Sequence, residues 1–72
     1  MKKAYKLVDL GCANCAAKME RAILKIRGVQ SASIQFMAGR LVIEAEEADL
    51  DRILAEAGRV IARIEPQCII AQ

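Results

Sequence analysis

The sequence predicts an α+β domain in which two helices cover one face of a four-stranded antiparallel sheet. Two kinds of observation lead to this prediction. Apolar residues alternate in several short stretches and recur at helical spacing in two longer ones, and the stretches follow the order strand, helix, strand, strand, helix, strand. A chain of 72 residues supports one small core. Residues 1–72 are therefore interpreted as a single domain.

Residues 4–10 are predicted to form the first strand, with Tyr5 and Leu7 facing inward. A helix is expected from about Asn14, a favourable N-cap residue, to Arg27. Its inward positions recur at helical spacing at Cys15, Met19, Ala22, Ile23 and Ile26. Gly28 is expected to end this helix, because glycine tolerates the positive φ of a helix terminus.

Residues 29–37 and 41–45 alternate and are predicted to form a hairpin closed by residues 38–40. Acidic residues at 46, 47 and 49 mark the start of a second helix that runs to about Ile64. Its inward positions are predicted to be Leu50, Ile53, Leu54, Ala57, Val60, Ile61 and Ile64. Gly58 inside this helix is interpreted as a close-packing position. Pro66 ends the helix, and residues 67–71 form the last strand.

This order of elements is that of the ferredoxin-like, or split βαβ, fold. In that topology the last strand lies beside the first and runs in the opposite direction. The end of the first strand, which leads to Cys12, is therefore expected at the same edge as the start of the last strand, which carries Cys68.

Two cysteines, Cys12 and Cys15, stand three positions apart where the first strand gives way to the first helix. Unpaired N–H groups and the helix dipole stabilise a thiolate at such a place, so both thiols are expected to ionise near neutrality. Thiolates are the form of cysteine that binds metal ions. The pair is thus predicted to bind a soft metal ion; the alternatives are a disulfide and a buried, inert pair.

Composition excludes several other functions. The net charge is only +2, and one Tyr, one Phe and no Trp leave no aromatic platform for nucleic-acid bases. The chain has no histidine, and no serine–base pair or phosphate-binding glycine loop is apparent, so it is not expected to be an enzyme. Charges interrupt every apolar run, so no membrane insertion is expected. Without a secretory signal, and with an odd number of cysteines, a cytoplasmic location is expected.

The run from Leu10 to Ala16, with Lys18 to Ala22 and Gly28-Val29 after it, resembles the heavy-metal-associated domain family. That family comprises metallochaperones and the N-terminal domains of metal-transporting P-type ATPases. The resemblance implies that Cys12 and Cys15 are the metal ligands. It also implies a cytosolic module that exchanges metal with the transmembrane part of an ATPase or with a donor or acceptor protein. A free-standing metallochaperone is the alternative, and a thiol-disulfide oxidoreductase is a weaker one.

Two positions bear on the choice of metal. Copper-binding members of the family usually carry Met where this chain has Leu10, and many zinc-binding members carry Asp where it has Gly11. The Cys12–Ala16 run, with Ile64-Glu65-Pro66 before the last strand, is more similar to the ATPases that export zinc, cadmium and lead. Zinc, cadmium or lead is therefore the expected ion, with Cu(I) as the alternative.

A pair of thiolates satisfies Cu(I) but leaves a zinc site open. Cys68 and Asp9 are predicted as possible additional ligands; Glu65, water or a partner residue could also fill the site, and one ion could bridge a dimer. Without a metal role, Cys68 is a small buried hydrophobe and Asp9 a solvated carboxylate.

Three basic residues, Lys18, Arg21 and Lys25, share one face of the first predicted helix. They are predicted to form a docking stripe for an acidic partner surface, where charge complementarity speeds encounter. The alternative is an ordinary solvated helix face.

Overall fold

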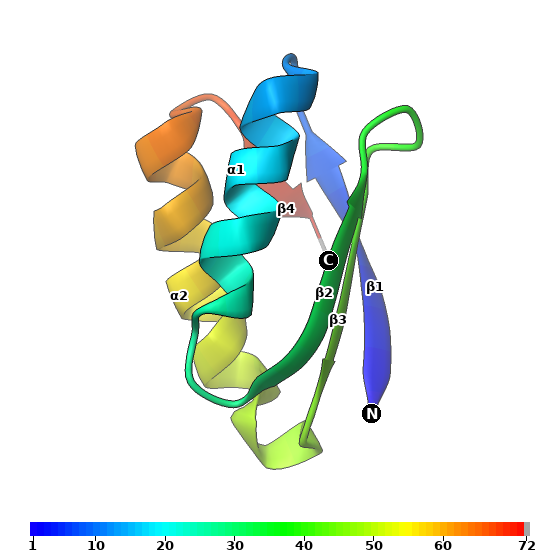
Figure 1. Cartoon of the computed structure of the whole chain (residues 1–72), viewed down its shortest axis with the longest axis vertical. Coiled ribbons are helices and arrows are strands. Elements are labelled where there is room, and N and C mark those ends of the chain that lie inside the picture. The colour runs from blue at the N-terminus through cyan, green and yellow to red at the C-terminus, as the bar shows by residue number, and fades with distance from the viewer. Residues whose placement is uncertain (72) are drawn as a thin grey trace.

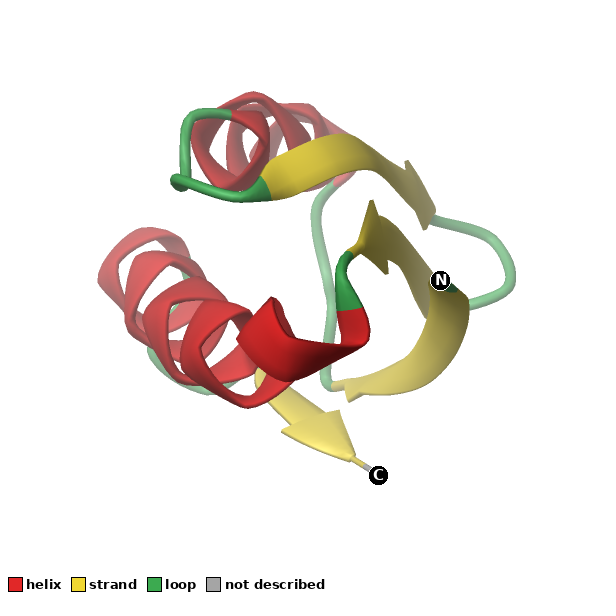
Figure 2. Cartoon of the chain, turned by 90° about the horizontal axis from the view of Figure 1, so that it is seen from below, coloured by secondary structure: helices red, strands yellow, loops and turns green. Residues whose placement is uncertain are grey.

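The computed structural model describes residues 1–71. The elements in chain order are β1 (Lys2–Val8), α1 (Ala13–Leu24), β2 (Val29–Gln35), β3 (Arg40–Ala45), the 3-10 turn η1 (Glu47–Asp49), α2 (Leu50–Ile64) and β4 (Ile69–Ala71). The strands pair antiparallel in the order β2-β3-β1-β4. Both helices lie on the same face of the sheet (Figures 1 and 2), which confirms the ferredoxin-like prediction.

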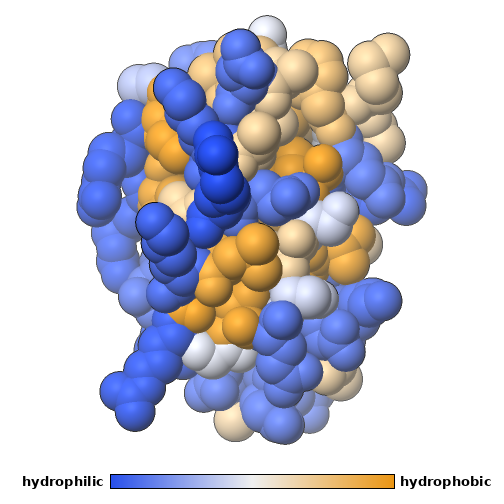
Figure 3. Space-filling model, in the orientation of Figure 1, coloured by the Kyte–Doolittle hydropathy of each residue, from blue (hydrophilic) through white to orange (hydrophobic). Residues whose placement is uncertain are grey.

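An aliphatic core fills the space between the helices and the sheet. In β3 the alternating residues Leu41, Ile43 and Ala45 are fully buried, as period-two patterning requires. The helices contribute Met19, Ile23, Ile53, Ala57 and Ile61, which are also fully buried. On the face of the molecule seen in Figure 1, hydrophilic side chains run over the surface and separate small apolar patches (Figure 3). Neither α1 nor α2, the two α-helices in the described residues, has both the length and the apolar character needed to cross a membrane.

The ends of several elements differ from the prediction. β1 stops at Val8 because Asp9 has a positive φ of 63°, which breaks the extended chain two residues early. α1 ends at Leu24, where the N–H of Lys25 donates to the carbonyl of Ala22 and tightens the last turn. Gly28, with a φ of 97°, completes the turn into β2, as expected of a helix stop.

The interpretation of Gly58 as a close-packing position was wrong. A Cβ atom at this position would meet no atom within 4 Å outside its own helical turns. Gly58 instead lines an open groove between α2 and β4. Packing therefore does not explain why this helix carries a glycine.

Candidate metal site

The loop between β1 and α1 places Cys12 at the N-cap of the helix. Its backbone is extended (φ −145°, ψ 122°), and its Sγ accepts a hydrogen bond from the N–H of Cys15 at 3.3 Å. Asn14 was predicted to be the N-cap, but it lies within the first turn. The sulfur of Cys12 thus occupies the acceptor position that an N-cap side chain normally fills, at the positive end of the helix dipole.

Cys12 and Cys15 are joined by hydrogen bonds, and their thiols have different pKa values as a result. Hydrogen bonds from the side chain and then the N–H of Cys15 lower the pKa of Cys12 below its ordinary 9.0. The same side-chain hydrogen bond, followed by burial and the charge of Cys12, raises the pKa of Cys15 to about 11. The expectation that both thiols ionise near neutrality was therefore wrong for the metal-free protein. An incoming cation must displace the proton that Cys15 holds at neutral pH.

The reduced, metal-free protein is expected to lose its two loop thiol protons in separate steps, one below a pKa of 9.0 and one near 11. In Cys15→Ala the pKa of Cys12 should rise, because its thiolate loses the thiol donor, but stay below 9.0, because the N–H of residue 15 still donates. Alkylation rates by iodoacetamide against pH, resolved by position with mass spectrometry, measure both steps. Equal pH dependence of the two cysteines would contradict this assignment.

A buried carboxylate, that of Glu65, lies against the same loop. Glu65 caps the C-terminus of α2 and is 6% exposed. Its Oε2 accepts hydrogen bonds from the N–H of Gly11 at 3.3 Å and from the side-chain amide of Gln67, whereas its Oε1 is buried without a partner. The Glu65 charge partly opposes the lowering of the Cys12 pKa and adds to the raising of the Cys15 pKa. The metal-free loop therefore brings together groups whose negative charges repel, and a cation would relieve that repulsion.

Cys68 and Asp9 were predicted as the two additional ligands, and Cys68 is held near Glu65, since its N–H donates to the Glu65 carbonyl at 3.0 Å. Cys68 is 2% exposed, packs in the core, and precedes β4 rather than belonging to it. Burial, then the charges of Glu65 and Asp9, raise its pKa. Asp9 is exposed. Within residues 1–71 no three cysteine or acidic side chains already converge as a metal site, so the role of each additional ligand stays a prediction.

The predicted docking residues are exposed but do not all lie beside the loop. Lys18 and Arg21 belong to α1, whereas Lys25 caps its far end. A helix of 12 residues is about 18 Å long, at 1.5 Å per residue, so Lys25 is remote from the cysteines. Of the three, Lys18 lies nearest the cysteines along the helix, whereas Arg21 lies in the last turn of α1.

Comparison with known proteins agrees with this arrangement. The model of the heavy-metal-associated domain matches residues 4–66. The chain is 26% identical over 72 residues to the cadmium, zinc and cobalt-transporting ATPase of Bacillus subtilis (strain 168), covering 100% of this chain but 10% of the ATPase. It is 28% identical over 50 residues to the copper chaperone CopZ of Enterococcus hirae, covering 69% of this chain and 72% of the chaperone.

Solved structures have the same fold. A CopZ metallochaperone superposes with a TM-score of 0.75 at 15% identity, over 99% of this chain and 100% of that one. The family match covers most of the chain and includes the loop that holds Cys12 and Cys15. The chain belongs to the heavy-metal-associated domain family, a family of domains that bind soft metal ions and are not themselves catalytic.

Proposed function

We propose that this chain binds a soft divalent ion through Cys12 and Cys15, with Glu65 turning towards the ion as a third ligand, as the metal-binding module of a zinc-, cadmium- or lead-transporting ATPase. Among residues 1–71 these three side chains do not already form a metal site, so the third contact requires the Glu65 side chain to move when the ion binds. The observation that carries the proposal is the buried Glu65 carboxylate beside the cysteine loop, with one oxygen unpartnered. A buried polar atom without a partner is costly, and a bound cation would satisfy it. In this role the module would exchange its metal ion with the rest of the transporter or with a separate donor protein.

The donor set favours a divalent ion over Cu(I). Two thiolates are enough for Cu(I), whereas Zn²⁺ takes four ligands and accepts carboxylate oxygen among them. Two sulfurs and one carboxylate leave a position for water or for a ligand from an acceptor protein. Such an open position lets an acceptor bind the ion before the cysteines release it.

The relatives supply independent support for the same choice. The Bacillus subtilis protein transports cadmium, zinc and cobalt by its name, and a probable cadmium-transporting ATPase of Listeria monocytogenes is 40% identical over 45 residues. The chain spans only about a tenth of the first and 6% of the second, so transport itself is part of the proposal. A free-standing copper chaperone is the second candidate, favoured by the likeness to CopZ.

Competition titrations with Cd²⁺, Zn²⁺, Pb²⁺ and Cu(I) test the proposal. Glu65→Gln keeps an oxygen that can accept from Gly11 but loses the charge. It is expected to weaken Cd²⁺ binding by about 10-fold to 100-fold, the range found when groups around a metal are lost, while Cu(I) binding changes little. Cadmium affinity that is unchanged in Glu65→Gln, with Cu(I) bound most tightly by the wild type, would favour the copper chaperone.

Two matched variants separate Glu65 from its neighbours. Asp9→Asn removes the same charge from an exposed position on the loop and should leave Cd²⁺ affinity nearly unchanged. Cys68→Ala removes the third sulfur. If Cd²⁺ affinity and the thiolate-to-metal absorption are unchanged in that variant, Cys68 is not a ligand and only packs in the core.

We also propose that Lys18 and Arg21 guide an acidic partner surface towards the loop. Both are exposed on α1, and complementary charge mainly speeds encounter. Lys18→Glu with Arg21→Glu should slow metal transfer to an acceptor at low salt without changing metal affinity. A transfer rate equal to that of the wild type would show that this face of α1 is an ordinary solvated surface without a role in docking.

A further inference from the structure

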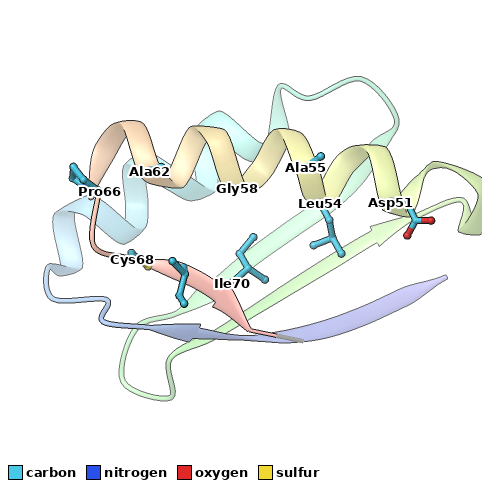
Figure 4. A pocket seen from close by; sticks show the side chains of 9 residues that line it. Asp51, Leu54, Ala55, Gly58, Ala62, Pro66, Cys68 and Ile70 are labelled. Carbon is cyan, nitrogen blue, oxygen red and sulfur yellow. The ribbon is translucent and has the colours of Figure 1, made fainter.

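The two outer strands of the sheet, β4 and β2, lie under different helices. β4 lies beneath α2, and the groove that Gly58 lines is formed by these two elements (Figure 4). β2 lies at the opposite side of the sheet and packs against α1 (Figure 1). Within residues 1–71, β2 pairs with β3 alone. The N–H and C=O groups on its outer edge therefore have no strand partner in this part of the chain.

A side chain of α1 occupies one of these groups. The Oε2 of Glu20, a half-buried residue, accepts a hydrogen bond from the N–H of Ile34 at 2.8 Å. The direction of the peptide groups alternates along a strand, so Ala32 also directs its N–H and C=O groups to the outer edge, whereas Ser33 directs its groups to β3. Glu20 therefore holds the edge at one of the positions where a further strand would pair.

The rest of this edge lacks the features that usually prevent pairing. Exposed edge strands commonly carry charges, proline or a bulge. Residues 28–39 include no charged residue and no proline. A bulge shifts the register between Val29 and Ser31, so it interrupts only the start of the strand. From Ser31 to Gln35 the edge is therefore protected by the carboxylate of Glu20.

Apolar side chains stand on both sides of Glu20 along α1. Ala17 lies three residues before it and Leu24 four residues after it, so all three share one side of the helix. That side faces the edge of β2, because Glu20 reaches Ile34 from it. Ala17 and Leu24 are exposed. Exposed apolar groups thus lie beside an uncharged strand edge, with the Glu20 charge between them.

The edge of β2 is complementary to itself. If two copies pair antiparallel about a two-fold axis at Ser33, Ser33 lies opposite its own copy and Ala32 lies opposite Ile34. Ala32 and Ile34 pack against the core on the helix-covered face, and Ser33 is exposed on the other face. No like charges from the two strands would then meet. Only the two Glu20 carboxylates would oppose the pairing, since each holds the N–H that the other strand needs.

We propose that the outer edge of β2 is a surface for pairing with a second copy of this chain, and that Glu20 keeps the chain monomeric by occupying it. Removal of the carboxylate frees the N–H of Ile34 and joins the apolar groups around it, so that one sheet continues through both copies. Main-chain hydrogen bonds between the two strands supply the affinity, as in other cases of strand addition.

This pairing is independent of the proposed metal function. β2 runs towards the hairpin, and the N–H of Leu7 at the end of β1 donates to the carbonyl of Gly39 in that hairpin. The cysteine loop after β1 therefore lies at the hairpin end of the sheet (Figure 1). Antiparallel pairing turns the two hairpin ends in opposite directions, so the two copies cannot share an ion between their cysteine pairs.

Sedimentation equilibrium of the reduced chain in the presence of EDTA tests the proposal. The wild type should be a monomer, and Glu20→Ala should dimerise with a dissociation constant lower by about tenfold or more. Glu47→Ala removes the same charge from an exposed position and should behave as the wild type. Glu20→Ala that associates no more than the wild type, or a wild type that is itself a stable dimer, would overturn the proposal.

Glu20→Gln separates the hydrogen bond from the charge and provides a second folded variant. Its amide oxygen can still accept from the N–H of Ile34, but the charge is lost. It should dimerise more tightly than the wild type and less tightly than Glu20→Ala. Tighter dimerisation of Glu20→Gln than of Glu20→Ala would contradict the role given to the hydrogen bond.

Charges placed at Ser33 test the register. Ser33→Lys added to Glu20→Ala should restore the monomer, because like charges directly opposite each other destabilise strand pairing. Ser33→Glu added to Glu20→Ala should do the same. A mixture of these two double variants should form heterodimers, since the opposite charges then face each other. Dimers that persist in either double variant alone would place the contact elsewhere and overturn the assignment to β2.

Amide exchange and metal dependence distinguish other modes of association. In the Glu20→Ala dimer, exchange should slow at Ala32 and Ile34 compared with the monomeric Ser33→Lys double variant. Protection confined to the cysteine loop, or association that requires Cd²⁺, would indicate a metal-bridged dimer. Growth beyond the dimer would indicate aggregation rather than a closed pair of edges. Each of these results would overturn the proposal.

Discussion

Replacing Cys12 and Cys15 together by serine is expected to weaken Cd²⁺ and Cu(I) binding by more than about 100-fold, since the loss of a supporting group around a metal already costs 10-fold to 100-fold. Serine is chosen because its oxygen can still accept the hydrogen bond that Cys12 Sγ receives from the N–H of residue 15. The helix start is therefore preserved while both thiolates are lost. Competition titration against a chelator of known affinity measures the effect.

The matching alanine pair separates capping from metal binding. Cys12→Ala with Cys15→Ala should lose metal affinity to the same extent, but should also destabilise the metal-free protein by up to about 1 kcal/mol, because the N-cap acceptor is gone. Urea unfolding of the two double variants measures this difference. Strong soft-metal binding that survives in the serine variant would place the ligands elsewhere in the chain and refute the site.

Ile23→Ala is expected to destabilise the domain by about 2–5 kcal/mol, through lost apolar burial and the cavity left behind. Ile23 is fully buried in the core. A domain of 72 residues has a total stability of about 4–11 kcal/mol, at 0.05–0.15 kcal/mol per residue. This one truncation should therefore remove a large fraction of the stability, and the urea midpoint should fall accordingly.

The neighbouring residue provides a matched control. Leu24 stands next to Ile23 on α1 but is 43% exposed, so Leu24→Ala should cost much less, within about 1 kcal/mol. Equal destabilisation by the two variants would mean that α1 packs on the sheet through a different face. The comparison therefore tests the orientation of the helix that carries Cys15.

The local pattern of residues was enough to predict the elements and how they are arranged. The stripe through Met19 and Ile23 and the alternation of Leu41 and Ile43 each correspond to buried faces in the structure. Such patterns can be recognised in a sequence because an element with one face on the core repeats its apolar residues at a fixed spacing. That spacing is about 3.6 residues in a helix and two in a strand. The position of the cysteine pair at the start of α1 follows from the same pattern.

Details that depend on backbone geometry were harder to predict from the sequence. The predicted cap was Asn14, a residue type that is common at N-caps, yet the cap is Cys12 because the loop makes its turn earlier. The length of β4 was also overestimated, and Cys68 consequently lies before the strand. Statistical preferences say which residue types are common at the end of an element, but they do not fix the exact position of that end. The exact position depends on the backbone dihedral angles of individual residues, such as the φ of 63° at Asp9.

The order of apolar and polar residues thus dictates the fold and the location of the two loop sulfurs, because both depend on periodicity and on neighbours within a few positions. Folding in three dimensions decides what surrounds them. Glu65 is 54 positions from Gly11, and only the return of α2 to the cysteine loop buries its carboxylate there. Contacts between distant segments create these environments, and no local pattern encodes them.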